Sequence, residues 1–276
     1  MKRILKILYI AVIILLAAVF LYSAVSLLRY YTESRESQDK YNSLANLVIA
    51  ARPTQSAVTD PTAGSTVPAN PWITITDPAT GEAMEILPEY AEAYQLNPHM
   101  VGWIAIDGTT ISYPVVQTSV DNPDYYLHRD FYGDYDSHGC IYAREQCDVD
   151  KPSDNVVIYG HRMKDHTMFG QLAKYESKSF WEANQYIRFD TLTEHHTYQI
   201  VYVLITSATQ GEGFAYHSFV DARDTSDWNS FLMHCQKLAL YDTGLDIEQG
   251  DKLITLSTCE YTQENGRLVV VAKRID

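Results

Sequence analysis

Apolar residues run without interruption over residues 7–28, a stretch of 22 positions that carries no charge. A helix of about 20 apolar residues spans a bilayer, whereas the apolar core of a signal peptide is shorter, roughly 7–15 residues. On length alone the pattern predicts a retained transmembrane helix. Small residues at Ser23, Ala24 and Ser26 resemble a cleavage site, so processing of this segment stays open as an alternative.

The charges on either side of this segment predict its orientation. Three basic residues lie within residues 1–6, whereas Arg29 and Arg35 are offset by Glu33 and Glu36. Because the more basic flank of a membrane helix stays in the cytoplasm, we expect a cytoplasmic N-terminus and an extracellular remainder of the chain. The protein is thus predicted to be a single-pass protein of the cell membrane.

The pattern after the anchor divides the chain into further segments. Residues 30–51 begin polar and then place apolar residues at helical spacing, which fits either a stalk helix or a helix packed on the following domain. Residues 53–70 are rich in Thr, Ser, Pro and Ala and read as a linker. We therefore expect an N-terminal tip and anchor over residues 1–29, a stalk and linker over 30–71, and one extracellular domain over 72–276.

Short strands dominate the pattern from residue 72 onward. Asp107-Gly108, between two apolar runs, is the strongest hairpin signal in the chain. Many short strands with few helices favour a mainly β fold, a closed or nearly closed β-barrel. The expected strands are residues 103–106, 109–116, 139–143, 155–160, 186–190, 197–206, 253–256 and 267–275, and the expected helices are residues 88–96, some turns within 168–181, and 226–240 with Thr225 or Ser226 as N-cap.

Composition narrows the class of function. Hydrophobic residues make up 46% of the chain, enough for a packed core. Acidic residues outnumber basic ones by 35 to 21, which gives a net charge of −14. Nucleic-acid binding draws on clustered Lys and Arg, so this balance argues against a nucleic-acid partner.

A cysteine comes at the end of the second-to-last predicted strand. In the stretch KLITLSTCE, residues 253–256 predict a strand and Cys259 comes where that strand ends. The polar loop 260–266 leads into a strand that begins at Arg267, and an antiparallel hairpin would place Arg267 beside Cys259. A neighbouring cation favours the reactive thiolate. The alternative is a small core cysteine and a solvated arginine.

A histidine occupies a similar position elsewhere in the chain. His161 follows the predicted strand 155–159 and Gly160. A Cys and a His at strand ends far apart in sequence are a candidate nucleophile and acid/base pair. Taken alone, a single histidine is more often structural.

Together these residues resemble the motifs of the sortases, and in detail those of class B. TLSTC at residues 255–259 is similar to the nucleophile motif of the family, YGH at 159–161 to its histidine segment, and Arg267 to its arginine. The segments GWIAIDGTTISYPVVQ and DNPDYYLHRDF and the order of anchor, linker and domain extend the resemblance. The long segment 207–244, with its helix between the last three strands, points to class B. The resemblance implies a closed β-barrel of about eight strands.

The resemblance also implies an activity. Sortases are cysteine transpeptidases, that is, thiol proteases that transfer the acyl group, and they work on the surface of Gram-positive cells. The implied partners are secreted proteins with a C-terminal sorting motif, here expected to be of the Asn-Pro-x-Thr type, and an amine of a peptidoglycan precursor. No metal and no organic cofactor are expected. Two alternatives are a sortase that polymerises pilins and a membrane-anchored binding domain without catalysis.

The family's roles carry over residue by residue. Cys259 would attack the scissile carbonyl, His161 would act as general acid and base, and Arg267 would either hydrogen-bond the oxyanion or hold the substrate backbone. A further wall of the groove is expected from residues 206–216. Residues expected to line the substrate groove are Asn122, Leu127, Tyr159, Ser257 and Glu260.

Several other polar or sulfur-bearing residues have simpler interpretations. Cys140 and Cys147 could be disulfide-bonded or free in an extracellular domain, and Cys235 lies on the apolar stripe of a predicted helix. The aspartates between residues 121 and 136 lack the spacing of an EF-hand and read as a solvated loop. His195-His196 reads as an exposed hairpin turn.

Overall fold

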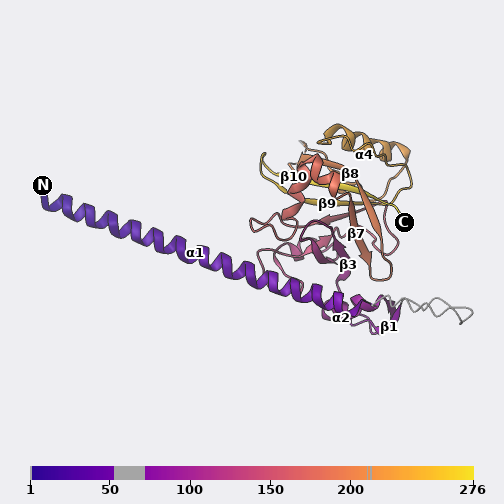
Figure 1. The fold of residues 1–276 in the computed structure, drawn as a ribbon, viewed down its shortest axis with the longest axis horizontal. Helices are drawn as coiled ribbons and strands as arrows, with labels where there is room; N and C mark the ends of the chain where they lie inside the picture. The colour runs from indigo at the N-terminus through magenta and orange to yellow at the C-terminus, as the bar shows by residue number, and fades with distance from the viewer. Residues whose placement is uncertain (1, 53–71, 210, 212) are drawn as a thin grey trace, which may run out of the picture. The chain divides into compact units, whose positions relative to one another are not determined.

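The computed structural model describes residues 2–52, 72–209, 211 and 213–276. The chain forms two compact units, Met1–Lys40 and Tyr41–Asp276. Helix α1 spans Lys2–Ala51 and is drawn in indigo to violet in Figure 1. Its apolar part has a mean hydropathy of 2.9 over 18 residues, none of them buried, so it is long and apolar enough to cross a membrane. The predicted linker, residues 53–70, lies outside the described residues.

Eight strands close into a barrel, as the sequence predicted. Their order around the barrel is β10-β8-β7-β3-β4-β5-β6-β9, and β1 and β2 form a separate two-stranded sheet. The strands are β1 Ile73–Thr76, β2 Ala83–Ile86, β3 Met100–Ala105, β4 Ser112–Gln117, β5 Ile141–Ala143, β6 Asn155–Tyr159, β7 Tyr186–Thr191, β8 Thr197–Ser207, β9 Leu253–Glu260 and β10 Gly266–Arg274.

Six antiparallel pairs, three of them the predicted hairpins, and two parallel pairs build the barrel. The predicted hairpins β3–β4, β7–β8 and β9–β10 are all present. Gly108 adopts a φ of +75° in the first of them, a left-handed conformation that glycine accommodates readily. Pairs β4–β5 and β6–β9 are parallel, so their partners come from distant parts of the chain.

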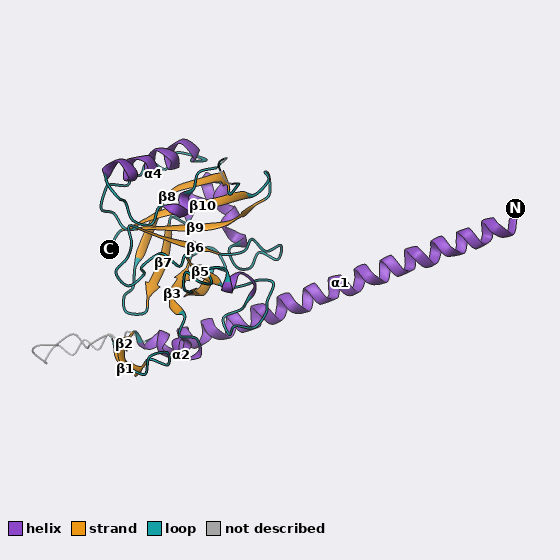
Figure 2. Cartoon of the chain, turned by 180° about the vertical axis from the view of Figure 1, so that it is seen from behind, coloured by secondary structure: helices purple, strands orange, loops and turns teal. Residues whose placement is uncertain are grey.

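Helices cover the barrel without interrupting it. Helix α4, Thr225–Leu238, packs on β8 and buries Trp228, Phe231 and Cys235 (Figure 2). Its N-cap is Asp224, whose carboxylate accepts a hydrogen bond from the Asp227 N–H at 2.9 Å, so the predicted caps at Thr225 and Ser226 are wrong by one or two positions. The remaining helices are α2 Pro88–Leu96, α3 Lys178–Ala183 and the 3-10 turns η1 Tyr125–His128, η2 Gly170–Glu176 and η3 Tyr216–Ser218.

The last turns of α1 belong to the same compact unit as the barrel. Tyr41, Leu44 and Val48 are buried in the core. The Tyr41 hydroxyl also donates to the Gly139 carbonyl at 2.7 Å. Of the two interpretations of residues 30–51, packing on the domain therefore holds for the C-terminal end of the helix.

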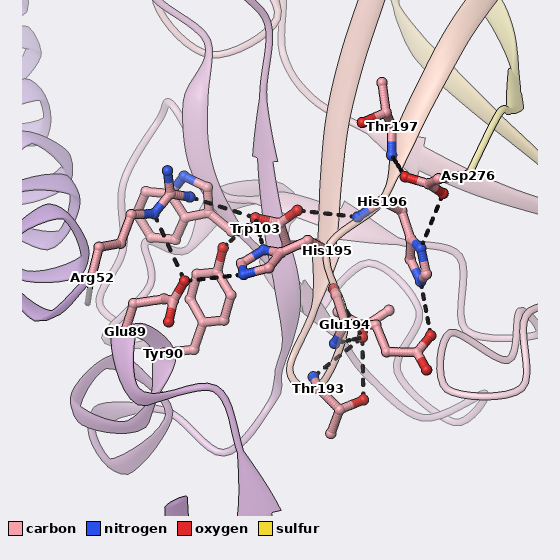
Figure 3. A network of polar contacts seen from close by, with 12 residues as sticks. Arg52, Glu89, Tyr90, Trp103, Thr193, Glu194, His195, His196, Thr197 and Asp276 are labelled. Carbon is pink, nitrogen blue, oxygen red and sulfur yellow. Dashed lines mark hydrogen bonds and ion pairs between the residues drawn. The ribbon is translucent and has the colours of Figure 1, made fainter. Parts of the chain in front are cut away.

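A polar network joins this helix end to α2 and to the β7–β8 turn (Figure 3). His195 lies between two buried carboxylates, with Nδ1 at 3.0 Å from Asp190 and Nε2 at 3.3 Å from Glu89. Arg52 approaches the same carboxylates at 3.5 and 3.8 Å. His195 is half exposed, but His196 is largely buried against Glu194 and Asp276, so the prediction of an exposed turn is wrong for His196.

The aspartate-rich loop is also more ordered than predicted. Asp130 is buried, and its carboxylate accepts hydrogen bonds from the N–H groups of Tyr132 and Asp134, both at 3.0 Å. The prediction of a solvated loop is therefore wrong for Asp130, which organises the backbone of this turn.

Candidate active site

The parallel pair β6–β9 brings the two distant motifs to one end of the barrel. Its register pairs Asn155 with Leu253 and Tyr159 with Ser257. His161 follows Tyr159 by two positions, and Cys259 follows Ser257 by two. Because parallel strands run in the same direction, His161 and Cys259 each come two positions after the paired residues Tyr159 and Ser257, at the same end of the strands. The backbone ladder thus explains how residues 98 positions apart meet.

A pocket of about 360 Å³ opens at this end of the barrel. It contains six of the eight predicted site residues: Leu127, Tyr159, His161, Ser257, Cys259 and Arg267. The other lining residues, which the sequence did not single out, are Pro123, Asp124, Tyr142, Arg144, Glu145, Gly160 and Thr258. The volume is within the usual range for small-molecule and peptide side-chain sites, roughly 300–1,000 Å³.

Arg267 lies directly across the hairpin from Cys259. The two residues are register partners in the antiparallel pair β9–β10, as predicted. The Arg267 Nη1 donates to the carbonyls of Gly266 at 2.9 Å and Asn265 at 3.3 Å. These neutral acceptors position the guanidinium without neutralising its charge, and both Arg267 and Cys259 line the pocket.

Cys259 is the accessible thiol of the chain. The four cysteines are all free, and Cys140, Cys147 and Cys235 are buried while Cys259 is half-buried. Burial raises the pKa of the Cys140 thiol to about 12 and that of Cys147 to about 11. The alternative of a Cys140–Cys147 disulfide is therefore not realised in this structure, and Cys235 is a core residue as predicted.

The imidazole of His161 is held by a backbone carbonyl. Its Nε2 lies 2.7 Å from the Leu127 oxygen, and because a carbonyl only accepts, Nε2 carries a proton. Burial lowers the pKa of His161, and the nearby rings of His128 and His138 lower it further, while the Leu127 hydrogen bond acts in the opposite direction. The free nitrogen of the neutral ring is thus Nδ1.

Two predicted groove residues have other contacts. Asn122 is exposed and outside the pocket lining, and its backbone carbonyl accepts from the Thr118 hydroxyl at 2.9 Å. Glu260 is buried, and its carboxylate accepts from the Thr262 hydroxyl at 2.7 Å and the Thr262 N–H at 2.8 Å. Each is nevertheless the sequence neighbour of a lining residue, Pro123 and Cys259 respectively.

The segment 206–216 reaches the same end of the barrel. The Tyr216 hydroxyl lies 2.6 Å from the Ser257 hydroxyl, and the Phe214 N–H donates to Thr206 Oγ1 at 2.9 Å. The neighbouring positions 210 and 212 lie outside the described residues. Tyr142 and Arg144 could have been anticipated only from strand pairing, because Tyr142 is the register partner of Tyr159.

Comparison with protein families identifies the fold. A model of the sortase domain matches residues 104–275, more than half of the chain. The chain belongs to the sortase family. Sortase B of Listeria monocytogenes is 32% identical over 69% of this chain and 76% of its own length, and Sortase B of Staphylococcus aureus is 29% identical over the same shares.

Solved sortase structures share the fold of this sortase. The crystal structure of sortase B from Bacillus anthracis in complex with AAEK1 has a TM-score of 0.67 and 27% identity, and covers 89% of this chain and 99% of its own. The Staphylococcus aureus sortase B–substrate complex has a TM-score of 0.70 with the same coverage, and at 24% identity it bears on the fold alone. The resemblance to class B that the sequence indicated is thereby confirmed.

Proposed function

We propose that this sortase is a cysteine transpeptidase that cleaves a C-terminal sorting motif of secreted proteins and transfers them to an amine of the cell wall. The observation that supports the proposal is the pocket shared by Cys259, His161 and Arg267. A thiol, an imidazole and a fixed cation are the nucleophile, proton carrier and anion stabiliser that acyl transfer requires. We propose an Asn-Pro-x-Thr type of motif from the class B resemblance.

In the first half-reaction the Cys259 thiolate attacks the scissile carbonyl carbon. The carbonyl electrons move to oxygen, and the Arg267 guanidinium across the hairpin stabilises this oxyanion. When the intermediate collapses, the C–N bond breaks and the leaving amine takes a proton from His161. Since Nε2 is bonded to the Leu127 carbonyl, that proton is carried by Nδ1. The product on the enzyme is a thioester.

In the second half-reaction the acceptor amine replaces the leaving amine. Nδ1 of the now neutral His161 takes a proton as the amine attacks the thioester carbon, and Arg267 again faces the oxyanion. Collapse forms the new amide bond and releases the Cys259 thiolate. The free enzyme is restored with the same number of protons.

The walls of the pocket would hold the sorting peptide. We propose that Leu127, Tyr159 and Ser257 contact it directly, since all three line the pocket. Asn122 and Glu260 would act at its margins through their neighbours in sequence. The N-terminal helix would keep the enzyme in the cell membrane with its N-terminus in the cytoplasm, so that the barrel meets secreted proteins and the peptidoglycan precursor outside.

Peptide turnover tests the proposal. The full-length protein in detergent is incubated with quenched sorting peptides and an amine acceptor, and products are read by fluorescence and mass spectrometry. We expect cleavage and amide product for the wild type, an acyl-enzyme mass on Cys259, and no turnover for Cys259→Ala. Equal turnover by Cys259→Ala, with its melting curve unchanged, would end the mechanism.

Thiol labelling separates catalysis from a binding module whose cysteine is structural. In the native protein a small alkylating reagent should modify one cysteine per chain, and a sorting peptide should slow that modification. Labelling of all four thiols is expected only after denaturation, because the other three are buried. A native protein in which Cys259 resists the reagent would contradict the proposed role.

A further inference from the structure

A second arginine lines the pocket and is not used by the proposed mechanism. Arg144 follows β5, and its backbone N–H donates to the Val157 carbonyl of β6 at 2.8 Å. A turn closes immediately after it, with the Cys147 N–H bonded to the Arg144 carbonyl at 3.0 Å. The Gln117 side-chain amide donates to the carbonyls of both turn residues at 2.7 Å. The backbone that carries Arg144 is thus fixed on three sides.

The guanidinium of Arg144 is held by neutral groups. Its Nε and Nη2 donate to the Gln146 side-chain oxygen at 3.2 and 3.0 Å, and its Nη1 donates to the Tyr159 hydroxyl at 3.4 Å. Of the five N–H donors of a guanidinium these contacts use three, which leaves two, one on each terminal nitrogen. Two donors at the end of the fork match the two oxygens of a carboxylate.

Among the described residues, Arg144 forms no salt bridge. Asp124 and Glu145 line the same pocket, but within the described part of the chain neither lies at ion-pair distance from this guanidinium. Burial lowers the pKa of His217, and the charges of Arg144 and Arg267 lower it further. In a protein with a net charge of −14, the pocket thus holds two arginines that form no salt bridge within the described residues.

Resting on the transpeptidase function proposed above, we propose that Arg144 is a specificity-determining residue that binds a carboxylate of the substrate, carried by the sorting peptide or by the acceptor amine. The proposed reaction forms one oxyanion at a time, and Arg267, the register partner of Cys259, is the residue assigned to it. Arg144 lines the same pocket beside Tyr159, so its charge is available to a second anion that is present before the reaction begins.

Matched substrate pairs test this assignment in the full-length protein in detergent. In the donor arm, sorting peptides differ only by Asp or Asn at each position flanking the cleaved bond. In the acceptor arm, α-amino acid amines with a free carboxylate are compared with their carboxamides. The readout is the ratio of kcat/KM within a pair, so that a general loss of activity cancels. We expect the wild type to prefer the carboxylate by about tenfold or more in one arm, which identifies the source.

Two substitutions then assign the preference to Arg144. Arg144→Gln should bring the ratio in that arm close to one, and Arg144→Lys should keep part of it because the charge is retained. The matched control is Arg223→Gln, which removes an exposed arginine paired with Asp227 outside the pocket and should leave the ratio unchanged.

The possible results separate the two proposals. Ratios near one in both arms for the wild type, with neutral peptides still turned over, overturn the role of Arg144 and leave the transpeptidase intact. A full preference that survives in Arg144→Gln also overturns it. Absence of turnover with every peptide would overturn both.

Discussion

The contact between His161 and the Leu127 carbonyl decides which nitrogen can exchange protons. With Nε2 bonded at 2.7 Å, a rotation of the ring that presented Nε2 to the substrate would break this hydrogen bond. A buried carbonyl without a partner costs roughly 1–3 kcal/mol. The backbone of η1 thereby fixes both the tautomer and the orientation of the imidazole, as the carboxylate does in a Ser-His-Asp triad.

The ring of His128 is expected to tune His161. The two rings are stacked with centroids 5.6 Å apart, and the charge of His128 contributes to the lowered pKa of His161. We expect His128→Gln to raise the pKa of His161, because it removes a like charge. A histidine NMR titration measures the shift, and His234→Gln on α4 serves as the control. An unchanged or lower pKa in His128→Gln would show that the neighbouring charge has no influence.

Gly139 connects the loop after η1 to the position of His161. It adopts a φ of +61°, and a Cβ at this position would lie 2.5 Å from the Leu127 oxygen and 2.8 Å from the Tyr126 oxygen. We expect Gly139→Ala to reduce the free energy of unfolding by about 1–3 kcal/mol and to lower kcat, because the Leu127 carbonyl must move. Chemical denaturation and peptide turnover measure the two effects.

A control separates backbone strain from the displaced carbonyl. Gly81 also has a left-handed φ, +76°, but a Cβ there would meet nothing within 4 Å. Gly81→Ala should therefore cost stability by strain alone and keep full turnover. If Gly139→Ala lost stability but kept the kcat of the wild type, the proposed link from Gly139 to His161 would be wrong.

The network in Figure 3 is expected to make stability depend on pH. The hydrogen bond to Asp190 raises the pKa of His195 above its usual 6.5. Burial alone would raise the pKa of Asp190, but the hydrogen bonds from His195 and Tyr90 lower it below 3.8. The contribution of His195 to the free energy of unfolding is complete below pH 6.5 and is lost as pH rises through its raised folded-state pKa. The contribution of Asp190 is complete above pH 3.8 and is lost as pH falls through its lowered folded-state pKa.

Denaturation at several pH values checks this expectation. The wild type should lose up to about 1 kcal/mol of its unfolding free energy between roughly pH 6 and 9, a small effect because His195 is half exposed and solvent screens the pair. His195→Gln should remove this slope, and His234→Gln should keep it. Glu89 lies against the same ring, and Arg52 lies against Glu89. An unchanged slope in His195→Gln would therefore assign the pH dependence to groups other than His195.

Hairpins were predicted correctly from the sequence, whereas pairings between distant strands were not. Hairpins such as β3–β4 are marked by their own turn residues, and the register of Arg267 with Cys259 follows from the short loop between them. The parallel pair β6–β9 leaves no local mark, because its partners are separated by about a hundred residues. The lining residues Tyr142 and Arg144 depend on such pairings and were therefore missed.

At the scale of the whole molecule, the end of α1 is part of the structure that supports the site. Tyr41, Leu44 and Val48 recur at helical spacing and are buried. Because such an apolar stripe is equally typical of a free stalk helix, the sequence could not decide between a stalk and a helix packed on the domain. The predicted division at residues 71 and 72 stays a prediction. A soluble form that begins at residue 72 would lack this buried stripe.

The contribution of the stripe can be measured with two substitutions on neighbouring turns. Leu44 is 1% exposed and Ile49 is 64% exposed. We expect Leu44→Ala to lower the unfolding free energy by about 2–5 kcal/mol, because it empties a core position, whereas Ile49→Ala should change it by less than about 0.5 kcal/mol. Thermal or urea denaturation of the full-length protein in detergent gives both values. Equal effects would mean that α1 does not share the core.

The β6–β9 ladder has a consequence for how this enzyme can vary. Because the relative height of Cys259 and His161 is set by two adjacent backbones, the connecting chain between residues 162 and 251 does not determine it. Loops there can be lengthened, shortened or exchanged while the pairing of Tyr159 with Ser257 stays the same. The spacing of the two motifs is thus insulated from insertions and deletions in the chain that connects them.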